Sequence, residues 1–210
     1  MRQSVQAGQP RAVAPAPGPA LVSGPDPGHV LVAGVGNIFL RDDGFGPEVA
    51  RRLASEPLAF QPGVQVVDYG IRGMHLAYDL LDPVDALVLV DALPPGSGMP
   101  GDLRVMQITP EDLTSGSHIG QPHVGQPHVG LGLDLHGMDP LTVLARLRSL
   151  GGELPMTYLV GCVVADTEEG IGLSSAVEAA VPRAMAQVIS LAAQHVSAVA
   201  AELTPTDPRR

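Results

Sequence analysis

Residues 30–49 read VLVAGVGNIFLRDDGFGPEV, and this stretch decides the predicted fold. The apolar run Val30–Val35 has the length and β-branched content of a strand that is buried on both faces. Residues 34–37 interrupt the run with types that tolerate tight turns. Pro47 suits the first turn of a helix, and Glu48 suits the positive end of the helix dipole. The stretch therefore predicts a strand, a loop and a helix, in that order.

Two adjacent carboxylates, Asp42 and Asp43, lie between this predicted strand and its helix. Either can cap the helix. Alternatively, they belong to a functional site, because open α/β sheets bind ligands at the carboxyl ends of their strands. A dinucleotide-binding fingerprint fits poorly, since Phe39 stands where the third glycine is required after Gly34 and Gly36. This stretch alone leaves capping and a site both open.

The composition limits the partners and the chemistry of the chain. Its 210 residues are 45% hydrophobic, which is sufficient for one α/β domain with a sizeable core. The formal net charge is −10 and all twelve basic residues are arginine, so Schiff-base, P-loop and Ser-Lys chemistry are excluded. An acidic chain with no basic cluster and no run of ~18 apolar residues predicts no nucleic-acid and no membrane partner.

The ends of the chain and its cysteine content indicate where the protein resides. Residues 1–28 contain six prolines and are expected to form a disordered arm rich in Pro, Ala and Gly. The folded domain is expected at 29–198, with a disordered tail at 199–210. Cys162 is the single cysteine, and its apolar surroundings without a neighbouring His favour a buried thiol over a nucleophile. The arm has no signal-peptide core, and we expect a cytoplasmic protein.

Four further apolar runs predict the other strands of the sheet. They lie at residues 64–69, 84–93, 103–108 and 156–164. The run at 84–93 is nearly continuous in apolar residues, which is typical of a central parallel strand. Helices are expected up to about residue 55, at 76–81, from 140 and from 175. Ser175 and Glu178 are expected to form a capping box at the start of the last helix. The pattern predicts an α/β fold.

Asp91 lies at the carboxyl end of the predicted central strand, within the sequence LVDAL. A carboxylate among apolar residues is costly to desolvate unless it is capped, paired or bound to a metal. Right-handed crossovers make the first and third strands parallel, which brings Asp91 and Asp43 to the same edge of the sheet. This convergence is the first indication of a site.

Histidines form a second group of candidates. Residues 116–130 contain the repeat GQPHV twice and are expected to form a flexible insertion. The histidines of this insertion are His118, His123 and His128. They can bind a transition metal adventitiously, or the segment is only a slipped-repeat surface loop. His136 differs, because it stands just before Asp139 and Pro140, which can begin a helix.

Four blocks of sequence resemble the hydrogenase maturation endopeptidases. Residues 34–46, GVGNIFLRDDGFG, are similar to the family signature G-x-G-N-x-x-x-x-D-(D/E)-G-x-G. The other blocks keep the family's order: Asp91 within LVDA, His136 before an amphipathic helix, and LVG at 159–161 followed by GLS at 172–174. The resemblance covers about residues 29–195.

The resemblance implies a three-layer α/β sandwich with a mostly parallel central sheet flanked by helices. It also implies an endopeptidase that removes the carboxyl-terminal extension from the large-subunit precursor of a nickel–iron hydrogenase after nickel insertion. The positions that contact metal in the family correspond to Asp43, Asp91 and His136. The first two are the expected catalytic carboxylates. Residues of the same signature that are expected to contact the substrate are Gly36, Asn37 and Asp42. The implied metal is the precursor's own nickel, no nucleotide cofactor is expected, and the protein is expected to be a monomer.

The chemistry of the three side chains agrees with a metal-dependent reaction. Two carboxylates and an imidazole suit nickel, zinc or manganese. A metal could polarise the peptide carbonyl or activate water. The chain has neither a His-Glu-x-x-His motif nor a Gly-x-Ser-x-Gly elbow, which argues against a conventional zinc or serine peptidase. No separate nucleophile is indicated.

Two other functional classes remain open at this point. A non-catalytic nickel-binding accessory or assembly factor for hydrogenase would use the same three side chains. A nucleotide-dependent enzyme would use the same fold, but the chain lacks the third glycine and any P-loop.

Overall fold

The computed structural model describes residues 28–56, 62–114 and 140–202, and a five-stranded sheet forms their centre. The strands are β1 (Val30–Val35), β2 (Val64–Gly70), β3 (Ala86–Leu93), β4 (Leu103–Ile108) and β5 (Met156–Val163). Their order in the sheet is β2-β1-β3-β5-β4. All pairs are parallel except β4 with β5. The predicted mostly parallel sheet with a central third strand is confirmed.

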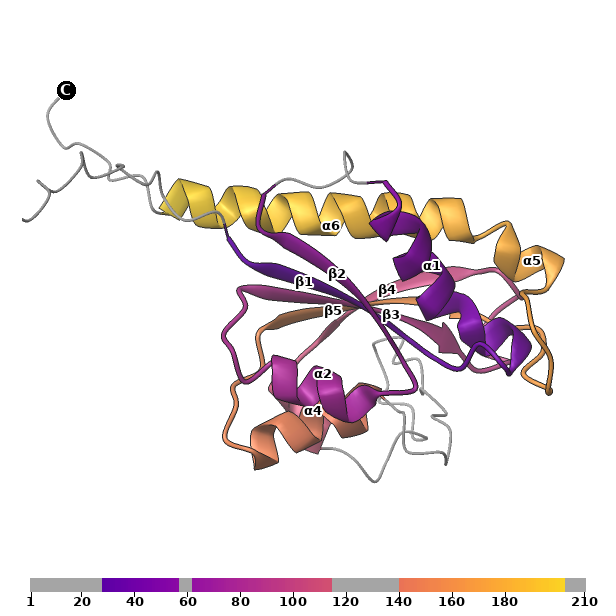
Figure 1. The fold of residues 1–210 in the computed structure, drawn as a ribbon, viewed down its shortest axis with the longest axis horizontal. Helices are drawn as coiled ribbons and strands as arrows, with labels where there is room; N and C mark the ends of the chain where they lie inside the picture. The colour runs from indigo at the N-terminus through magenta and orange to yellow at the C-terminus, as the bar shows by residue number, and fades with distance from the viewer. Residues whose placement is uncertain (1–27, 57–61, 115–139, 203–210) are drawn as a thin grey trace, which may run out of the picture.

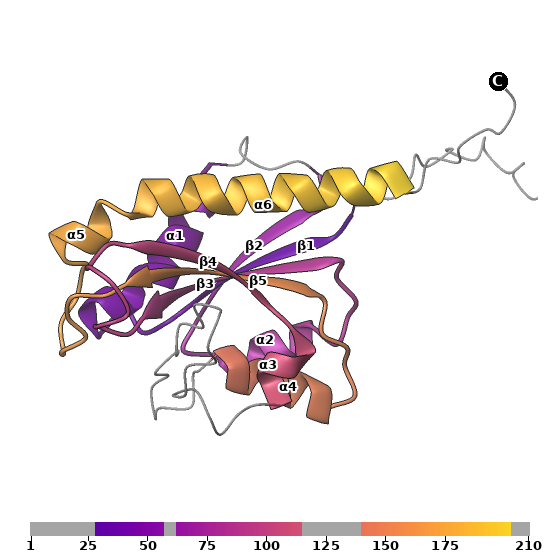
Figure 2. The same ribbon diagram turned by 180° about the vertical axis from the view of Figure 1, so that it is seen from behind.

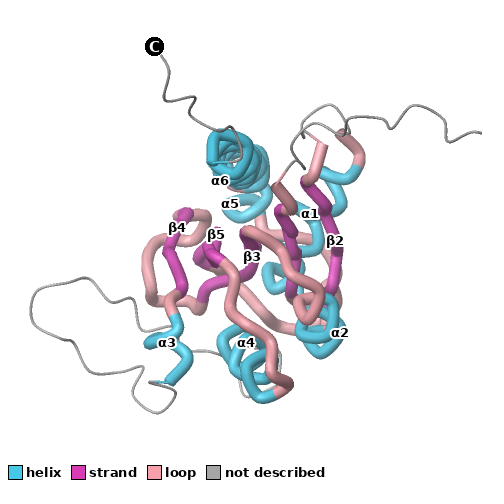
Figure 3. The backbone as a smooth tube through the Cα atoms, turned by 90° about the vertical axis from the view of Figure 1, so that its left-hand side faces the viewer, coloured by secondary structure: helices cyan, strands magenta, loops and turns pink. Residues whose placement is uncertain are grey.

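Helices cover both faces of this sheet. They are α1 (Phe45–Ala54), α2 (Gly73–Asp79), α3 (Pro110–Thr114), α4 (Pro140–Ser149), α5 (Ser175–Glu178) and α6 (Val181–Glu202), with a 3-10 turn η1 (Arg41–Gly44) before α1. The helices α1 and α6 lie on one face, and α2, α3 and α4 lie on the other (Figures 1 and 2). Viewed along the strands, the three layers are separate (Figure 3). The implied three-layer sandwich is confirmed.

The strand β1 connects two hydrophobic cores. All six of its residues are buried, as its apolar run predicts. Val30 and Val32 belong to the core beneath α1 and α6, whereas Leu31 and Ala33 belong to the core on the α2 and α4 side. This alternation follows from the two-residue period of a strand, which points successive side chains to opposite faces. The carboxyl end of β1 is therefore fixed from both sides.

The carboxyl-terminal helix differs from the expectation. It is divided into α5 and α6, and the predicted capping box is wrong: Ser174 is the N-cap residue, without a side-chain capping bond. Pro182 explains the division, because it has no N–H to continue the helical bonding to Glu178. The helix α6 then continues to Glu202, so the expected domain boundary at 198 falls within it.

Several expectations concern residues that the structure does not describe. They are the arm, apart from Gly28, the histidine-containing insertion at 116–130, His136, and the tail beyond Glu202. Among the helices of the described ranges, none combines the length and hydropathy needed to cross a lipid bilayer.

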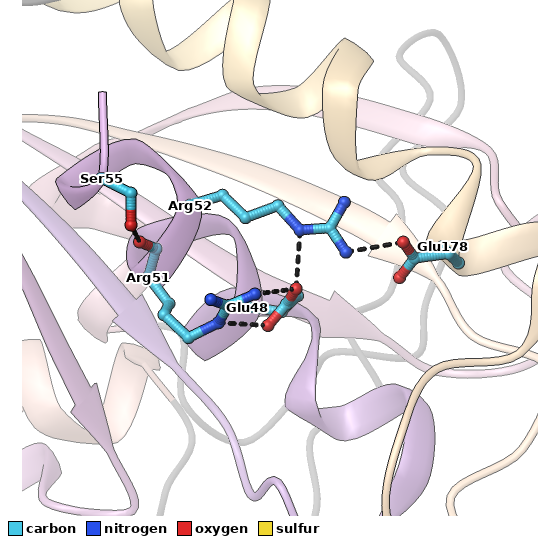
Figure 4. Close-up of polar contacts among 5 residues, drawn as sticks. All are labelled: Glu48, Arg51, Arg52, Ser55 and Glu178. Carbon is cyan, nitrogen blue, oxygen red and sulfur yellow. Dashed lines mark hydrogen bonds and ion pairs between the residues drawn. The ribbon is translucent and has the colours of Figure 1, made fainter.

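An ion-pair network joins α1 to α5 (Figure 4). Arg51 and Arg52 both bind the Glu48 carboxylate, and the Arg52 guanidinium continues to Glu178 at 2.6 Å. The hydrogen bond from Arg51, together with the one from Arg52, lowers the pKa of the Glu48 carboxyl. Glu178 therefore pairs across the fold instead of forming the predicted capping box. The network holds α5 close to α1.

Close packing at Gly46 sets the position of α1 on the sheet. A Cβ atom at this position would overlap the carbonyl oxygens of Val35, the last residue of β1, and Val90, which lies within β3. The helix can approach both strands only because residue 46 has no side chain. The turn η1, immediately before α1, is thereby held beside the carboxyl ends of the two strands.

Replacement of Gly46 by Ala should destabilise the fold by about 3 kcal/mol, because backbone must move to admit the methyl group. The measurement is the free energy of unfolding from urea titration. Gly151→Ala is the matched control. Gly151 has a φ of +88° but open space around it, so this variant should lose about 1 kcal/mol of unfolding free energy. Equal losses in the two variants would contradict the packing constraint.

Candidate active site

The candidate site lies at the carboxyl ends of β1 and β3. The turn η1, which follows β1 in sequence, contacts β3. Asp43 belongs to η1, and Asp91 belongs to β3, where it pairs with Gly161 of β5. The parallel pairing of β1 with β3 thus brings the elements that carry both carboxylates to one edge of the sheet, as the topology argument predicts.

Backbone N–H groups orient both carboxylates. The N–H of Asn37 donates to Asp43 Oδ2 at 2.7 Å, and the N–H of Ala92 donates to Asp91 Oδ1 at 2.8 Å. Asp91 is only 7% exposed, and Asp43 is partly buried. Hydrogen bonds to a charged acceptor are strong and directional. Backbone groups of their own segments therefore help to orient the carboxylates of Asp43 and Asp91.

The loop between β1 and η1 folds back on itself. Gly36 has a φ of +134°, and a Cβ atom there would overlap the carbonyl oxygen of Asp43. The side chain of Asn37 closes the turn, since its Oδ1 accepts the N–H of Phe39 at 3.0 Å. Gly36 and Asn37 thus shape the loop that holds Asp43. We retain their contact with a substrate as a proposal.

The neighbouring Asp42 has a different environment from Asp43. Its side chain is 0% exposed, and its oxygens accept hydrogen bonds from Ala165, Asp166 and Ser174. Neither aspartate caps α1, because its N-cap residue is Gly44 and makes no side-chain capping bond. The expected contact of Asp42 with a substrate does not agree with this interior position.

The structure describes two of the three side chains that the resemblance implies as metal contacts. His136 lies outside the described ranges, as do the three histidines of the insertion. Within the described ranges, no three His, Cys, Asp or Glu side chains form a group that could hold a metal ion. The oxygen donors of Asp43 and Asp91 suit a divalent cation, and an imidazole ligand would extend the choice to nickel.

Cys162 is a buried thiol at this end of β5. The side chain is 0% exposed, and burial raises its pKa to about 11, with a further contribution from the charge of Asp42. A thiol of this kind carries almost no thiolate at neutral pH and is a poor nucleophile. The prediction of a buried thiol agrees with the structure.

Contacts between two loops at this edge were not predicted. The N–H of Arg41 donates to the carbonyl of Gly170 at 3.0 Å, and the N–H of Gly170 donates to the carbonyl of Phe39 at 2.9 Å. The guanidinium of Arg41 also pairs with Asp166 at 3.2 Å. The sequence signal in this region is the glycine-rich block at 170–174, which precedes the last helix. The partners of Arg41 are far away in the chain, so no local pattern identifies them.

This chain is similar to known proteins along most of its length. The hydrogenase 2 maturation protease of Escherichia coli strain K12 is 31% identical over 162 residues, which are 77% of this chain and 89% of that protein. The solved structure of the hydrogenase maturating endopeptidase HybD from E. coli has a TM-score of 0.62 and 26% identity, covering 79% of this chain and 93% of that one. A hydrogenase 2 maturation peptidase from a Thaumarchaeota archaeon has a TM-score of 0.55 and 30% identity, covering 78% and 97%. No protein-family model matches the chain.

The raised pKa of Cys162 predicts slow reaction with thiol reagents. At about pH 8, where an exposed cysteine reacts readily, the native protein should react with dithiobis-nitrobenzoate only as slowly as it unfolds. The reaction should become fast and stoichiometric in guanidinium, as followed by the absorbance of the released thiolate. Rapid stoichiometric reaction of the native protein would contradict the buried position.

Proposed function

Because this chain belongs to the hydrogenase maturation protease family, we propose that it removes the carboxyl-terminal extension of the large-subunit precursor of a nickel–iron hydrogenase. The observation that carries the proposal is the arrangement of η1 and β3. The turn η1 brings Asp43 of the family signature, and β3 brings Asp91 of the LVDA block, to the carboxyl edge of the sheet. Similarity over 89% of the E. coli protease supports the same activity.

Asp43 and Asp91 are the proposed catalytic carboxylates, and with His136 they are the proposed contacts to nickel. The nickel is that of the loaded precursor and is therefore part of the substrate. Two carboxylates and an imidazole suit this ion. Contact with it would select precursor that has already received its metal, and it would place the peptide bond to be cut beside the site.

Hydrolysis needs a group that accepts a proton from the attacking water and later returns it to the leaving amine. A positioned carboxylate performs this transfer in many hydrolases. Asp43 and Asp91 are suited to it, because backbone N–H groups at 2.7 and 2.8 Å orient their carboxylates. Preorganised groups do not have to reorient during the reaction.

Further parts of the proposal concern partners and location. We propose that the protein acts as a monomer in the cytoplasm, without a nucleotide cofactor and without binding to nucleic acid or membrane. The net charge of −10 and the absence of lysine support the proposal that the protein binds neither nucleic acid nor an anionic membrane.

Nickel-loaded precursor should lose one carboxyl-terminal peptide when it is incubated with this protein, as measured by intact-mass spectrometry. Asp43→Asn, Asp91→Asn and His136→Ala should each reduce the rate by about 100-fold or more, since each removes a group that acts at the reacting centre. Circular dichroism should show that the variants remain folded.

Asp85→Asn is the matched control. Asp85 is exposed and accepts a hydrogen bond from the N–H of His29 at the opposite edge of the sheet, so this variant should cleave at the normal rate. Full activity in one of the three site variants would remove that residue from the site. No cleavage of a cognate precursor that contains nickel would favour the accessory or assembly factor instead.

A further inference from the structure

The buried carboxylate of Asp42 accepts four hydrogen bonds at the candidate site. Its Oδ1 accepts the N–H of Ser174 at 2.6 Å. Its Oδ2 accepts the N–H of Ala165 at 2.9 Å, the N–H of Asp166 at 3.2 Å and the hydroxyl of Ser174 at 2.9 Å. The side chain has no exposure to solvent.

Such a position is stable only when the charge is well compensated. A carboxylate without solvent is costly unless hydrogen bonds replace its hydration. At Asp42 the replacement comes from three backbone N–H groups and one hydroxyl, and these bonds to a charged acceptor are stronger than neutral ones. The guanidinium of the adjacent Arg41 binds Asp166. The donors are thus arranged around a carboxylate, and an amide would not satisfy them.

All of these donors come from one segment, the connection between β5 and α5. Ala165 and Asp166 lie at its beginning, and Ser174 lies at its end. Asp42 therefore joins both ends of this connection to η1. Its own N–H adds a further link, since it donates to the carbonyl of Asp166 at 3.1 Å.

The neighbouring residue in η1 is Asp43, whose carboxylate is held by the N–H of Asn37. Two consecutive aspartates in a short turn thus have separate tasks. Movement of η1 would displace Asp43 relative to β3, where Asp91 is located, because the two carboxylates belong to different elements.

We infer that Asp42 is a positioning residue, which clamps η1 to the connection between β5 and α5 and so fixes Asp43 opposite Asp91. Its kinetic consequence rests on the proposed peptidase function, whereas the clamp itself can be measured without it. The role is distinct from the contact with substrate that the family signature suggests for this position, because the carboxylate is enclosed by the chain's own donors.

The test compares Asp42→Asn with the wild-type protein in two measurements. The first is amide hydrogen exchange. In this variant the amide has one acceptor oxygen, and its NH₂ group faces an N–H or O–H donor. Exchange at Ala165, Asp166 and Ser174 should become at least about tenfold faster, with exchange in β1 and β3 unchanged.

The second measurement is steady-state cleavage of nickel-loaded precursor. Asp42→Asn should lower kcat by about 100-fold with a much smaller change in KM, because misplacement of a catalytic group by about 1 Å has this effect. Asp85→Asn, which changes an exposed carboxylate at the opposite edge, should alter neither exchange in the connection nor kcat.

If Asp42→Asn does not fold, the same two measurements are made on a second variant, Ser174→Ala. It removes one of the four hydrogen bonds and should lower kcat about fivefold, with faster exchange confined to residues 165–174. Because the Ser174 hydroxyl acts through Asp42, the double variant should be no slower than Asp42→Asn alone.

Three results would overturn the inference. They are unchanged exchange in the connection, a normal kcat despite faster exchange, and a raised KM with normal kcat, which would indicate direct substrate binding. A wild-type protein that leaves loaded precursor intact would contradict the proposed function only, since the exchange measurement still decides whether Asp42 is a clamp.

Discussion

Close contact between α1 and the ends of β1 and β3 is the constraint on which the candidate site depends. Gly46 permits it, because any side chain there would overlap the carbonyl oxygens of Val35 and Val90. The glycine at position 36 then lets the loop turn back against Asp43. A backbone that is packed this tightly has few alternative arrangements. The positions of the carboxylates follow from it.

The two aspartates of η1 show how adjacent residues of one type can have different tasks. Asp42 is enclosed and binds donors from the connection between β5 and α5. Asp43 is partly buried and bound by the loop that precedes it. The first stabilises the arrangement of two loops, and the second is proposed to act on the substrate. A 3-10 turn makes this division possible, because it points successive side chains in different directions.

Local sequence patterns predicted the parts of the fold that local physics determines. The apolar run of β1 and the nearly continuous run of β3 indicated buried parallel strands, and both were found. The division between α5 and α6 was not predicted, although Pro182, which has no N–H for a helical bond to Glu178, lies at this point of the chain. The helix α6 extends past the expected domain boundary at 198, in keeping with the helical propensity of the alanines in AVAAE at 198–202.

The candidate site was predictable in part. Its location followed from the parallel topology, which brings η1, the turn that carries Asp43, next to β3, the strand that carries Asp91. The interior role of Asp42 did not follow, because its partners lie more than 120 residues later in the chain. Burial and long-range hydrogen bonding are properties of the folded chain, and a motif cannot report them. The role of His136 stays a prediction.

A crystal structure of this protein with nickel, with diffraction recorded on both sides of the nickel absorption edge, would test most directly whether Asp43 and Asp91 face one metal ion. We predict an anomalous peak about 2 Å from a carboxylate oxygen of each residue, with His136 as a further ligand. Anomalous density confined to the histidine insertion, or none near Asp43 and Asp91, would contradict a shared site at this edge of the sheet.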